Sequence, residues 1–247
     1  KSDLIILAAR PAMGKTAFAL SLALNAAVKG KASVMVFSME MAKEQLGQRL
    51  LSMESKVPMQ SLKTGKLERR DWDDINIALD ILSKANIHID DTAGINIMEM
   101  KSKCRRLKAE EGLDLIVIDY LQLMNPEGKA DSRTQEISVI SRNLKLLAKE
   151  LNCPVLVLSQ LSRAPETRTD HRPMLSDLRE SGSIEQDADI VIFLYRDEYY
   201  NEDSEAHGEC EVIVAKQRSG PTGTVKITWL DKLTKFVDSM GSSGPGF

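Results

Sequence analysis

Short apolar runs alternate along this chain with longer segments in which apolar residues recur at helical spacing. The apolar runs show no polar alternation, which indicates strands covered on both faces, as in a parallel sheet. We expect strands at Leu4–Ala8, Ser33–Phe37, Ile87–Ile89, Leu115–Ile118, Val155–Leu158 and Ile190–Tyr195. We expect helices at Thr16–Val28, Lys43–Met53, Arg70–Lys84, Ile97–Glu110 and Gln135–Leu151. This alternation predicts an α/β fold with a mainly parallel, twisted sheet flanked by helices.

The C-terminal part of the chain has a different pattern. Two extended runs, Glu211–Lys216 and Thr224–Leu230, are separated by a turn that contains Gly and Pro, which predicts a β-hairpin appended to the sheet. The last residues are mostly Gly, Ser and Pro and are typical of a flexible tail. We therefore expect one domain over residues 1–237 and a C-terminal tail at 238–247.

The composition narrows the class of protein. With 43% hydrophobic and 28% charged residues it is typical of a globular protein, and no run is long and apolar enough to span a membrane. The net charge of −3 does not itself predict a nucleic-acid partner. Because aromatic residues make up only 4%, contact with nucleic acid would fall mainly on backbone phosphates. Cys104, Cys153 and Cys210 lie far apart, which predicts reduced, packed thiols and a cytoplasmic protein.

The segment between the first predicted strand and the first predicted helix has the pattern of a phosphate-binding loop. It consists of Ala9, Arg10, Pro11, Ala12, Met13, Gly14, Lys15, Thr16 and Ala17. Backbone N–H groups and a helix N-terminus hold phosphate oxygens in such loops. We expect Lys15 to reach the β- and γ-phosphates of ATP and the Thr16 hydroxyl to bind Mg²⁺. Ala9 stands where most such loops have Gly, which Ala can replace if its φ is negative.

Three polar residues follow other predicted strands. Asp119 ends the apolar run Leu115–Ile118 and suits the carboxylate that holds Mg²⁺, although an Asp in this place is often only a helix cap. Glu40 is a candidate general base for hydrolysis, or it complements the dipole of the next helix. Gln160 is a candidate sensor of the γ-phosphate, or simply a polar residue at a strand end.

These residues belong to runs that resemble a known family. The matching runs are ARPAMGKTAFAL, FSMEM, LIVIDYLQLM, LSQLSR, DLRESGSIEQDADIV and AKQRSGPTGT, and they extend from the start of the chain to about residue 237. The chain resembles the C-terminal motor domain of bacterial replicative helicases of the DnaB type. The resemblance implies a RecA-like P-loop NTPase fold and a homohexameric ring. It also implies ATP-driven movement along single-stranded DNA in the 5'-3' direction, with unwinding at the replication fork.

The resemblance also implies roles for particular residues. It assigns Glu40 as catalytic base, Gln160 as γ-phosphate sensor and Asp119 as the carboxylate associated with Mg²⁺. Residues that match Lys216 and Arg218 act in this family on the ATP of the neighbouring subunit. Such helicases also have an N-terminal collar domain, which we expect to lie outside this sequence, and the family implies a primase and a helicase loader as further partners.

The resemblance places the DNA contact in the loop that contains Arg179, Glu180 and Gly182. From the residues alone, a glycine beside N–H donors can approach a phosphate closely, while Ser183 and Gln186 also fit a capping box of an ordinary helical turn.

Other readings of the hairpin and of the basic residues stay open. An exposed Arg beside a Gly-Pro turn, as at Arg218, is usually solvated surface, although an arginine finger needs the same rigid projection. The basic run Lys101–Lys108 is more typical of a solvated helix face or a subunit contact than of a DNA site.

A recombinase-like ATPase, a small-molecule kinase and an ATP-dependent scaffold share the phosphate loop. A kinase would need an Arg-rich lid, and a scaffold would not need both Glu40 and Arg218.

Overall fold

The computed structural model describes residues 1–125, 132–178 and 182–239 of the chain. Their strands are β1 (Leu4–Ala9), β2 (Val34–Ser38), β3 (Ile87–Asp90), β4 (Leu115–Asp119), β5 (Val155–Gln160), β6 (Ile190–Tyr195), β7 (Glu209–Gln217), β8 (Gly223–Leu230) and β9 (Lys235–Asp238). The α-helices are α1 (Lys15–Val28), α2 (Lys43–Ser55), α3 (Met59–Thr64), α4 (Arg69–Ser83), α5 (Ile97–Glu110), α6 (Arg133–Leu151) and α7 (Gly182–Asp187). Short 3-10 turns include η1 (Leu121–Leu123), η2 (Ala164–Thr167) and η3 (Leu175–Asp177).

In these residues the strands form one nine-stranded sheet in the order β3-β2-β4-β5-β1-β6-β7-β8-β9. The strands from β3 to β6 in this order are parallel, and β7, β8 and β9 extend the sheet in antiparallel fashion. The predicted α/β class and the mainly parallel sheet are therefore confirmed. Each predicted strand and helix is present with ends shifted by at most a few residues, and the structure adds α3, α7 and β9.

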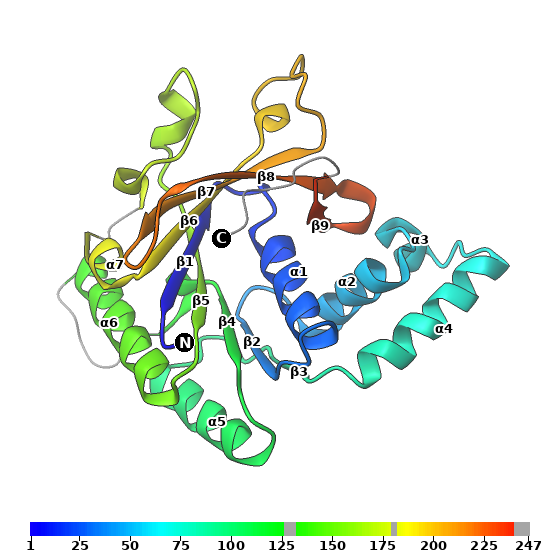
Figure 1. Cartoon of the computed structure of the whole chain (residues 1–247), viewed down its shortest axis with the longest axis horizontal. Helices are drawn as coiled ribbons and strands as arrows, with labels where there is room; N and C mark the ends of the chain where they lie inside the picture. Colours follow the sequence, from blue (N-terminus) through cyan, green and yellow to red (C-terminus); the bar gives the residue numbers. More distant parts are fainter. Residues whose placement is uncertain (126–131, 179–181, 240–247) are drawn as a thin grey trace.

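Helices cover both faces of the parallel part of the sheet (Figure 1). Leu4 and Ile6 of β1 point into a core shared with α5 and α6, while Leu7 and Ala9 point into a core shared with α1 and α2. Burial of one such leucine or isoleucine side chain contributes roughly 1.5–3 kcal/mol to the free energy of unfolding. Burial on both faces explains why the strand sequences lack polar alternation.

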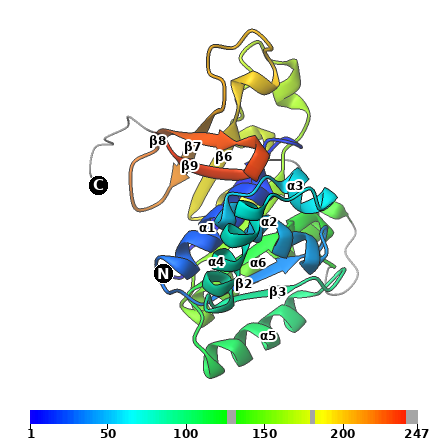
Figure 2. The ribbon, with the colours of Figure 1, turned by 90° about the vertical axis from the view of Figure 1, so that its right-hand side faces the viewer.

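The antiparallel strands fold back over α1 (Figure 2). The ring of Phe236 in β9 packs edge-on against Phe18 of α1, with centroids 5.6 Å apart, and lies 4.6 Å from the ring of Trp229 in β8. The predicted hairpin is confirmed as β7 and β8. Asp238, the first residue of the predicted tail, pairs with Ile227 as the last residue of β9, and residues 240–247 lie outside the described part of the chain.

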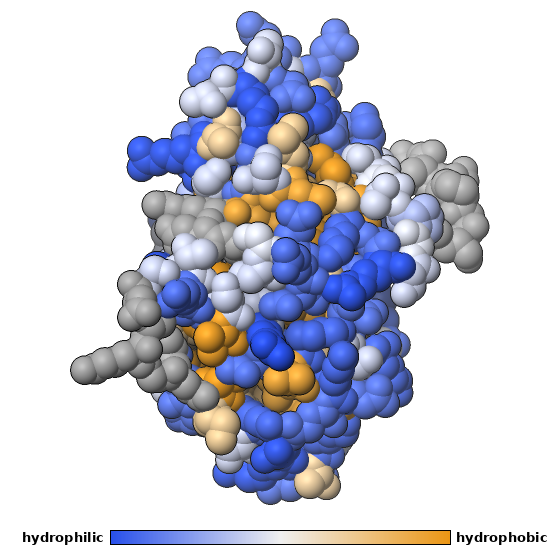
Figure 3. Space-filling view, turned by 90° about the vertical axis from the view of Figure 1, so that its left-hand side faces the viewer, coloured by the Kyte–Doolittle hydropathy of each residue, from blue (hydrophilic) through white to orange (hydrophobic). Residues whose placement is uncertain are grey.

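Several surface and core features follow the sequence predictions. Cys104, Cys153 and Cys210 are buried and free of disulfides, as predicted. Basic residues of α5 form ion pairs, Lys101 and Arg105 with Glu150 of α6, which favours a solvated helix face over a DNA site. The face on the α6 side is mainly hydrophilic with separate hydrophobic patches (Figure 3). No helix of the described residues has the length and apolar character needed to cross a bilayer.

Strand register brings the polar strand ends together. Ala9 at the end of β1 pairs with Gln160 at the end of β5, and Ser38 at the end of β2 pairs with Asp119 at the end of β4. Because these strands are parallel, their carboxyl ends meet at one edge, which is where open α/β sheets bind their ligands.

Candidate nucleotide-binding site

A cavity of about 360 Å³ opens at this edge of the sheet. It is lined by Pro11, Ala12, Gly14, Lys15, Thr16, Ala17, Glu40, Arg49, Asp119, Tyr120, Gln160, Trp229 and Thr234. Most of the residues that the sequence singled out for phosphate, metal and catalytic roles thus lie around one space, although they come from the ends of four different strands.

The phosphate loop follows β1 and ends where α1 begins. Ala9 is the last residue of β1 and has an extended backbone, so glycine is not required there. Ala12 and Gly14 have positive φ values of 64° and 94°. A Cβ atom at Gly14 would lie 3.0 Å from two ring carbons of Phe236. Glycine is therefore required at position 14 both by its backbone conformation and by the close approach of β9.

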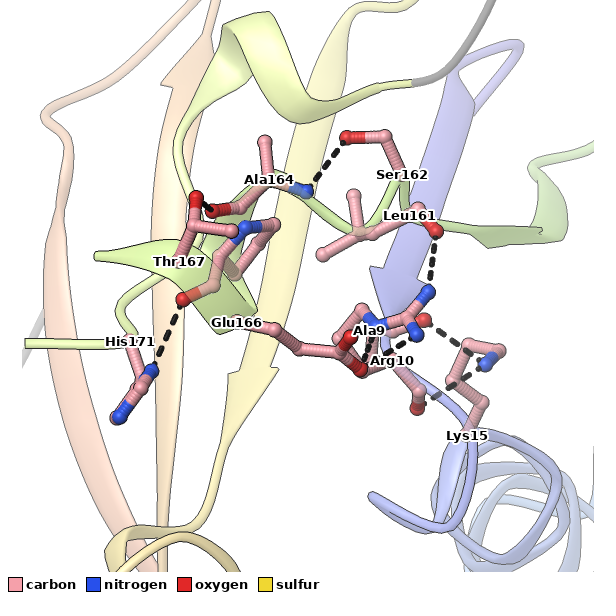
Figure 4. A network of polar contacts seen from close by, with 10 residues as sticks. Ala9, Arg10, Lys15, Leu161, Ser162, Ala164, Glu166, Thr167 and His171 are labelled. Atoms are coloured by element: carbon pink, nitrogen blue, oxygen red, sulfur yellow. Dashed lines mark hydrogen bonds and ion pairs between the residues drawn. The ribbon is translucent and has the colours of Figure 1, made fainter.

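The ammonium group of Lys15 lies inside the loop (Figure 4). Its Nζ atom donates to the carbonyl oxygens of Ala9 at 2.9 Å and Arg10 at 3.4 Å. Burial lowers the pKa of Lys15 to about 8, while the carboxylates of Asp119 and Glu40 oppose the shift. A partly buried cation with a lowered pKa gains most when an anion such as a phosphate binds beside it.

Thr16 and Asp119 form a compact pair of oxygen donors. The hydroxyl of Thr16 donates to Oδ2 of Asp119 at 2.6 Å. Burial raises the pKa of Asp119, and the hydrogen bond from Thr16 opposes that shift. Mg²⁺ prefers hard oxygen ligands and in phosphate sites needs only one or two protein groups, because water and phosphate oxygens supply the rest. The hydroxyl and carboxylate therefore fit a phosphate-bound Mg²⁺.

Glu40 lies in the bend after β2. The N–H of Met39 donates to the carbonyl oxygen of Asp119 at 2.8 Å, which ties this bend to the end of β4. The side chain of Glu40 lines the cavity, whereas the acidic residue in the first turn of α2 is Glu44. This arrangement disfavours the alternative in which Glu40 serves mainly to complement the helix dipole.

Gln160 ends β5 beside the phosphate loop, and its backbone is held by a residue that the sequence did not single out. Gln122 in η1 donates from Nε2 to the hydroxyl of Ser159 at 3.0 Å, and its Oε1 accepts from the N–H of Gln160 at 3.4 Å. These bonds join the segments that follow β4 and β5 and fix the strand end that carries Gln160.

Three members of the predicted loop do not line the cavity. Ala9 and Met13 are buried in the core beneath it. The side chain of Arg10 turns away from Lys15 toward Glu166 (Figure 4).

The cavity also contains residues that sequence patterns did not identify. Arg49 of α2 adds a second cation, and burial lowers its pKa against the opposing effect of Asp119 and Glu40. Trp229 and Thr234 come from the antiparallel extension. The guanidinium of Arg196 lies over the Trp229 ring at 5.0 Å from its centroid, which fixes the indole beside the phosphate loop.

Lys216 and Arg218 do not reach this cavity within their own chain. Nζ of Lys216 donates to the carbonyl oxygens of Glu185 at 2.5 Å and Ala188 at 2.8 Å. Arg218 donates from Nη2 to the carbonyl of Gln186, and its side chain is 53% exposed. Both cations therefore lie at the C-terminal end of α7, where carbonyl groups lack helical partners.

The predicted DNA loop is only partly described. Arg179 and Glu180 lie outside the described residues, and Gly182 is the exposed first residue of α7. The capping box suggested by Ser183 is wrong, because Ser183 lies inside α7 and its hydroxyl accepts from Ser138 of α6 at 2.8 Å.

The fold and the phosphate loop define a RecA-like P-loop NTPase domain of the α/β class. The model of the DnaB-like helicase C-terminal domain matches residues 1–238, and the chain belongs to this family.

Curated relatives and solved structures agree with this assignment. The chain is 56% identical to the replicative DNA helicase DnaB of Geobacillus stearothermophilus and 54% identical to the replicative DNA helicase DnaC of Bacillus subtilis (strain 168), over 96% of its own length and 53% of theirs. It thus spans about half the length of these relatives.

Among solved structures, a DnaB-like replicative helicase studied for its interactions with primase is 45% identical at a TM-score of 0.92, over 96% of this chain and 57% of that one. A solved ATPase domain is 45% identical at a TM-score of 0.93, over 96% of this chain and 85% of that one.

Proposed function

We propose that this chain is the motor domain of an ATP-dependent replicative DNA helicase, which hydrolyses ATP at the subunit interfaces of a hexameric ring. Hydrolysis drives the ring along single-stranded DNA and unwinds the duplex at the replication fork. The observation that supports this best is the hydrogen bond from Thr16 to Asp119 in the cavity that Lys15, Glu40 and Gln160 also line.

Phosphate binding in this proposal rests on the loop and on two cations. Backbone N–H groups from Ala12 to Ala17 and the N-terminus of α1 would hold the phosphate oxygens. Lys15 would leave the carbonyl oxygens of Ala9 and Arg10 and bind the β- and γ-phosphates. Arg49, which also lines the cavity, would add positive charge. A bound Mg²⁺, held by Thr16 and by Asp119, would neutralise charge on the β- and γ-phosphates.

Hydrolysis requires a water molecule aligned with the terminal phosphate. Glu40 lines the cavity and is tied to β4 through the neighbouring Met39, so its carboxylate would orient and polarise that water. Gln160 would contact the γ-phosphate and respond to its loss. Because Gln122 holds the backbone of Gln160, a shift of this strand end would also move the segment that follows β4.

Completion of the site by a neighbour explains the position of the hairpin cations. Lys216 pairs with Val191 of β6 near the end of β7, Arg218 follows that strand, and neither residue lines the cavity of its own chain. In a ring they would enter the adjacent subunit's cavity and stabilise the charge that develops on the phosphate during hydrolysis. Hydrolysis would therefore depend on contact between subunits.

DNA would be contacted by Arg179, Glu180 and Gly182 of each subunit, mainly at backbone phosphates. The net charge of −3 gives little long-range attraction, so repetition of the loop around a homohexamer would sum weak contacts. Primase and a helicase loader are the further protein partners that this function implies, and the cytoplasm is the compartment that it implies.

Phosphate release, measured with and without single-stranded DNA, tests the proposal. We expect hydrolysis of ATP that single-stranded DNA stimulates and that the Lys15→Ala variant lacks. Transfer of phosphate to a small acceptor without any effect of DNA would instead indicate a kinase. Tight ATP binding without turnover would indicate a nucleotide-dependent scaffold.

A further inference from the structure

Arg10 is the second residue of the phosphate loop, yet it does not line the cavity, and its side chain points toward Glu166 and Leu161 (Figure 4). Its Nε and Nη2 atoms donate to Oε1 of Glu166 at 3.0 and 2.6 Å. Its Nη1 atom donates to the carbonyl oxygen of Leu161 at 2.9 Å. All three donor nitrogens of the guanidinium are thus engaged by the segment that follows β5.

That segment, residues 161–178, folds back on itself. Leu161 and Leu178 at its two ends form an antiparallel bridge, and the N–H of Ser162 donates to the carbonyl of Asp177 at 2.9 Å. The carboxylate of Asp177 forms an ion pair with Arg168. We name this unit the 161–178 segment. Because its two ends are joined, Glu166 and Leu178 belong to one closed unit.

The 161–178 segment also packs against Tyr200. Its residue His171 forms a hydrogen bond through Nδ1 with the carbonyl of Pro165 at 3.0 Å, and the His171 ring stacks on Tyr200 with ring centroids 4.4 Å apart. The Arg10 side chain is 11% exposed and the Glu166 side chain 44% exposed. A charge-assisted hydrogen bond to a largely buried guanidinium is stronger than an ordinary surface ion pair.

The segment connects the two parts of the proposed machinery. Its first residue, Leu161, follows Gln160, and the N–H of Leu161 donates to the carbonyl of Ala9 at 3.3 Å. Its last residue, Leu178, directly precedes the residues proposed to contact DNA. Arg10 therefore bonds to a unit that lies between the γ-phosphate sensor and the DNA contact.

We propose that Arg10 is a positioning residue that, through its ion pair with Glu166, couples the phosphate loop to the 161–178 segment and so to the DNA contact. This inference rests on the proposed function. Nucleotide binding at the loop and DNA binding beyond Leu178 then influence each other, and by linkage each ligand changes the affinity of the other by the same factor.

The Glu166→Ala variant tests the coupling because Glu166 does not line the nucleotide cavity. We expect ATP-analogue affinity and hydrolysis without DNA to stay within about threefold of the unchanged protein, whereas stimulation by single-stranded DNA falls about tenfold. The ratio of DNA dissociation constants without and with the ATP analogue should fall by a similar factor. Glu202→Ala, at an exposed loop position, is the matched control and should change none of these quantities.

A double-mutant cycle with Arg10→Gln separates coupling from phosphate binding. If the two residues act as a pair, the double variant loses no more DNA stimulation than either single variant. Unchanged DNA stimulation in Glu166→Ala would overturn the inference. Loss of ATP-analogue binding in Arg10→Gln, with normal binding in Glu166→Ala, would also overturn it, because Arg10 would then be a phosphate ligand. A melting temperature close to that of the unchanged protein shows that the variants are folded. Hydrolysis that DNA does not stimulate in the unchanged protein would instead overturn the proposed function itself.

Discussion

The hydroxyl of Thr16, in the first turn of α1, donates a 2.6 Å hydrogen bond to the carboxylate of Asp119 at the end of β4. The two residues are 103 positions apart in the chain and meet because β1 and β4 both end at the same edge of the sheet. A hydroxyl and a carboxylate in this position are the donor pair that a phosphate-bound Mg²⁺ requires.

The first prediction concerns the hydroxyl of Thr16. In Thr16→Ala the carboxylate of Asp119 loses its hydrogen-bond donor and the proposed metal loses one oxygen ligand. We expect turnover to fall on the order of 100-fold, as for loss of a group that stabilises transition-state charge. Titration of a fluorescent ATP analogue with Mg²⁺ and with EDTA should show a smaller Mg²⁺ effect than in the unchanged protein. Thr64→Ala is the control, because Thr64 is exposed and its hydroxyl donates to the carbonyl of Gln60 within α3.

The second prediction follows from burial of Lys15, which lowers its pKa to about 8. Phosphate binds the protonated form of the Lys15 amine, so above about pH 8 the binding of ATP is accompanied by uptake of a proton. Affinity for ATP should therefore fall as pH rises through 8 and be about tenfold weaker at pH 9 than at pH 7. In Lys15→Arg the charge persists at both pH values, and any remaining affinity should be independent of pH. Equal affinity of the unchanged protein at pH 7 and pH 9 would count against Lys15 as the phosphate ligand.

The same shift has a consequence for stability without nucleotide. The pKa of Lys15 is lower in the folded state than its ordinary value of 10.5, so the unfolded chain binds more protons between pH 8 and 10.5. The contribution of Lys15 to the free energy of unfolding should therefore become more favourable as pH rises through this window.

The third prediction concerns the hairpin cation Arg218. Since its side chain lies outside the cavity of its own chain, Arg218→Ala should bind the ATP analogue nearly as well as the unchanged protein but lose turnover. Arg106→Ala, on the exposed face of α5, is the control. An equal mixture of Lys15→Ala and Arg218→Ala subunits should regain activity at roughly a quarter of the interfaces, because random pairing restores one complete site in four. No recovery in the mixture would contradict action in trans.

The fourth prediction concerns Gly14, which has a φ of 94° and no room for a Cβ beside Phe236. Gly14→Ala should lower the free energy of unfolding by roughly 1–3 kcal/mol, through strain in the left-handed conformation and displacement of the ring. Gly47→Ala, in the interior of α2 with no atoms near its Cβ position, should instead raise it by about 0.5–1 kcal/mol. Urea unfolding of both variants measures the two changes. Equal stabilities for Gly14→Ala and the unchanged protein would contradict the close packing of β9 on the loop.

Patterns within single segments of the sequence predicted most of the fold and most of the residues that line the cavity. Strand runs such as Leu4–Ala9 are apolar on both faces because helices cover both, and this is visible in the sequence itself. Parallel strands place Lys15, Asp119 and Gln160 at one edge, so their meeting follows from the fold class.

The rest depends on contacts between distant segments. Trp229 and Thr234 reach the cavity only because β9 folds back onto α1 through Phe236 and Phe18. β9 is four residues long and follows Thr234, which has a positive φ of 48°, and neither feature stands out in the sequence. Arg49 resembles any surface cation of a helix until the fold shows which side of α2 borders the cavity. The bond between Arg10 and Glu166 joins residues 156 positions apart.

A structure determined with a non-hydrolysable ATP analogue and Mg²⁺ tests the central assignment most directly. We expect the triphosphate between residues 12 and 17, with Nζ of Lys15 moved from the carbonyls of Ala9 and Arg10 onto the β- and γ-phosphates and Thr16 beside the metal. A nucleotide bound elsewhere, with Lys15 still on those carbonyls and the cavity empty, would contradict it.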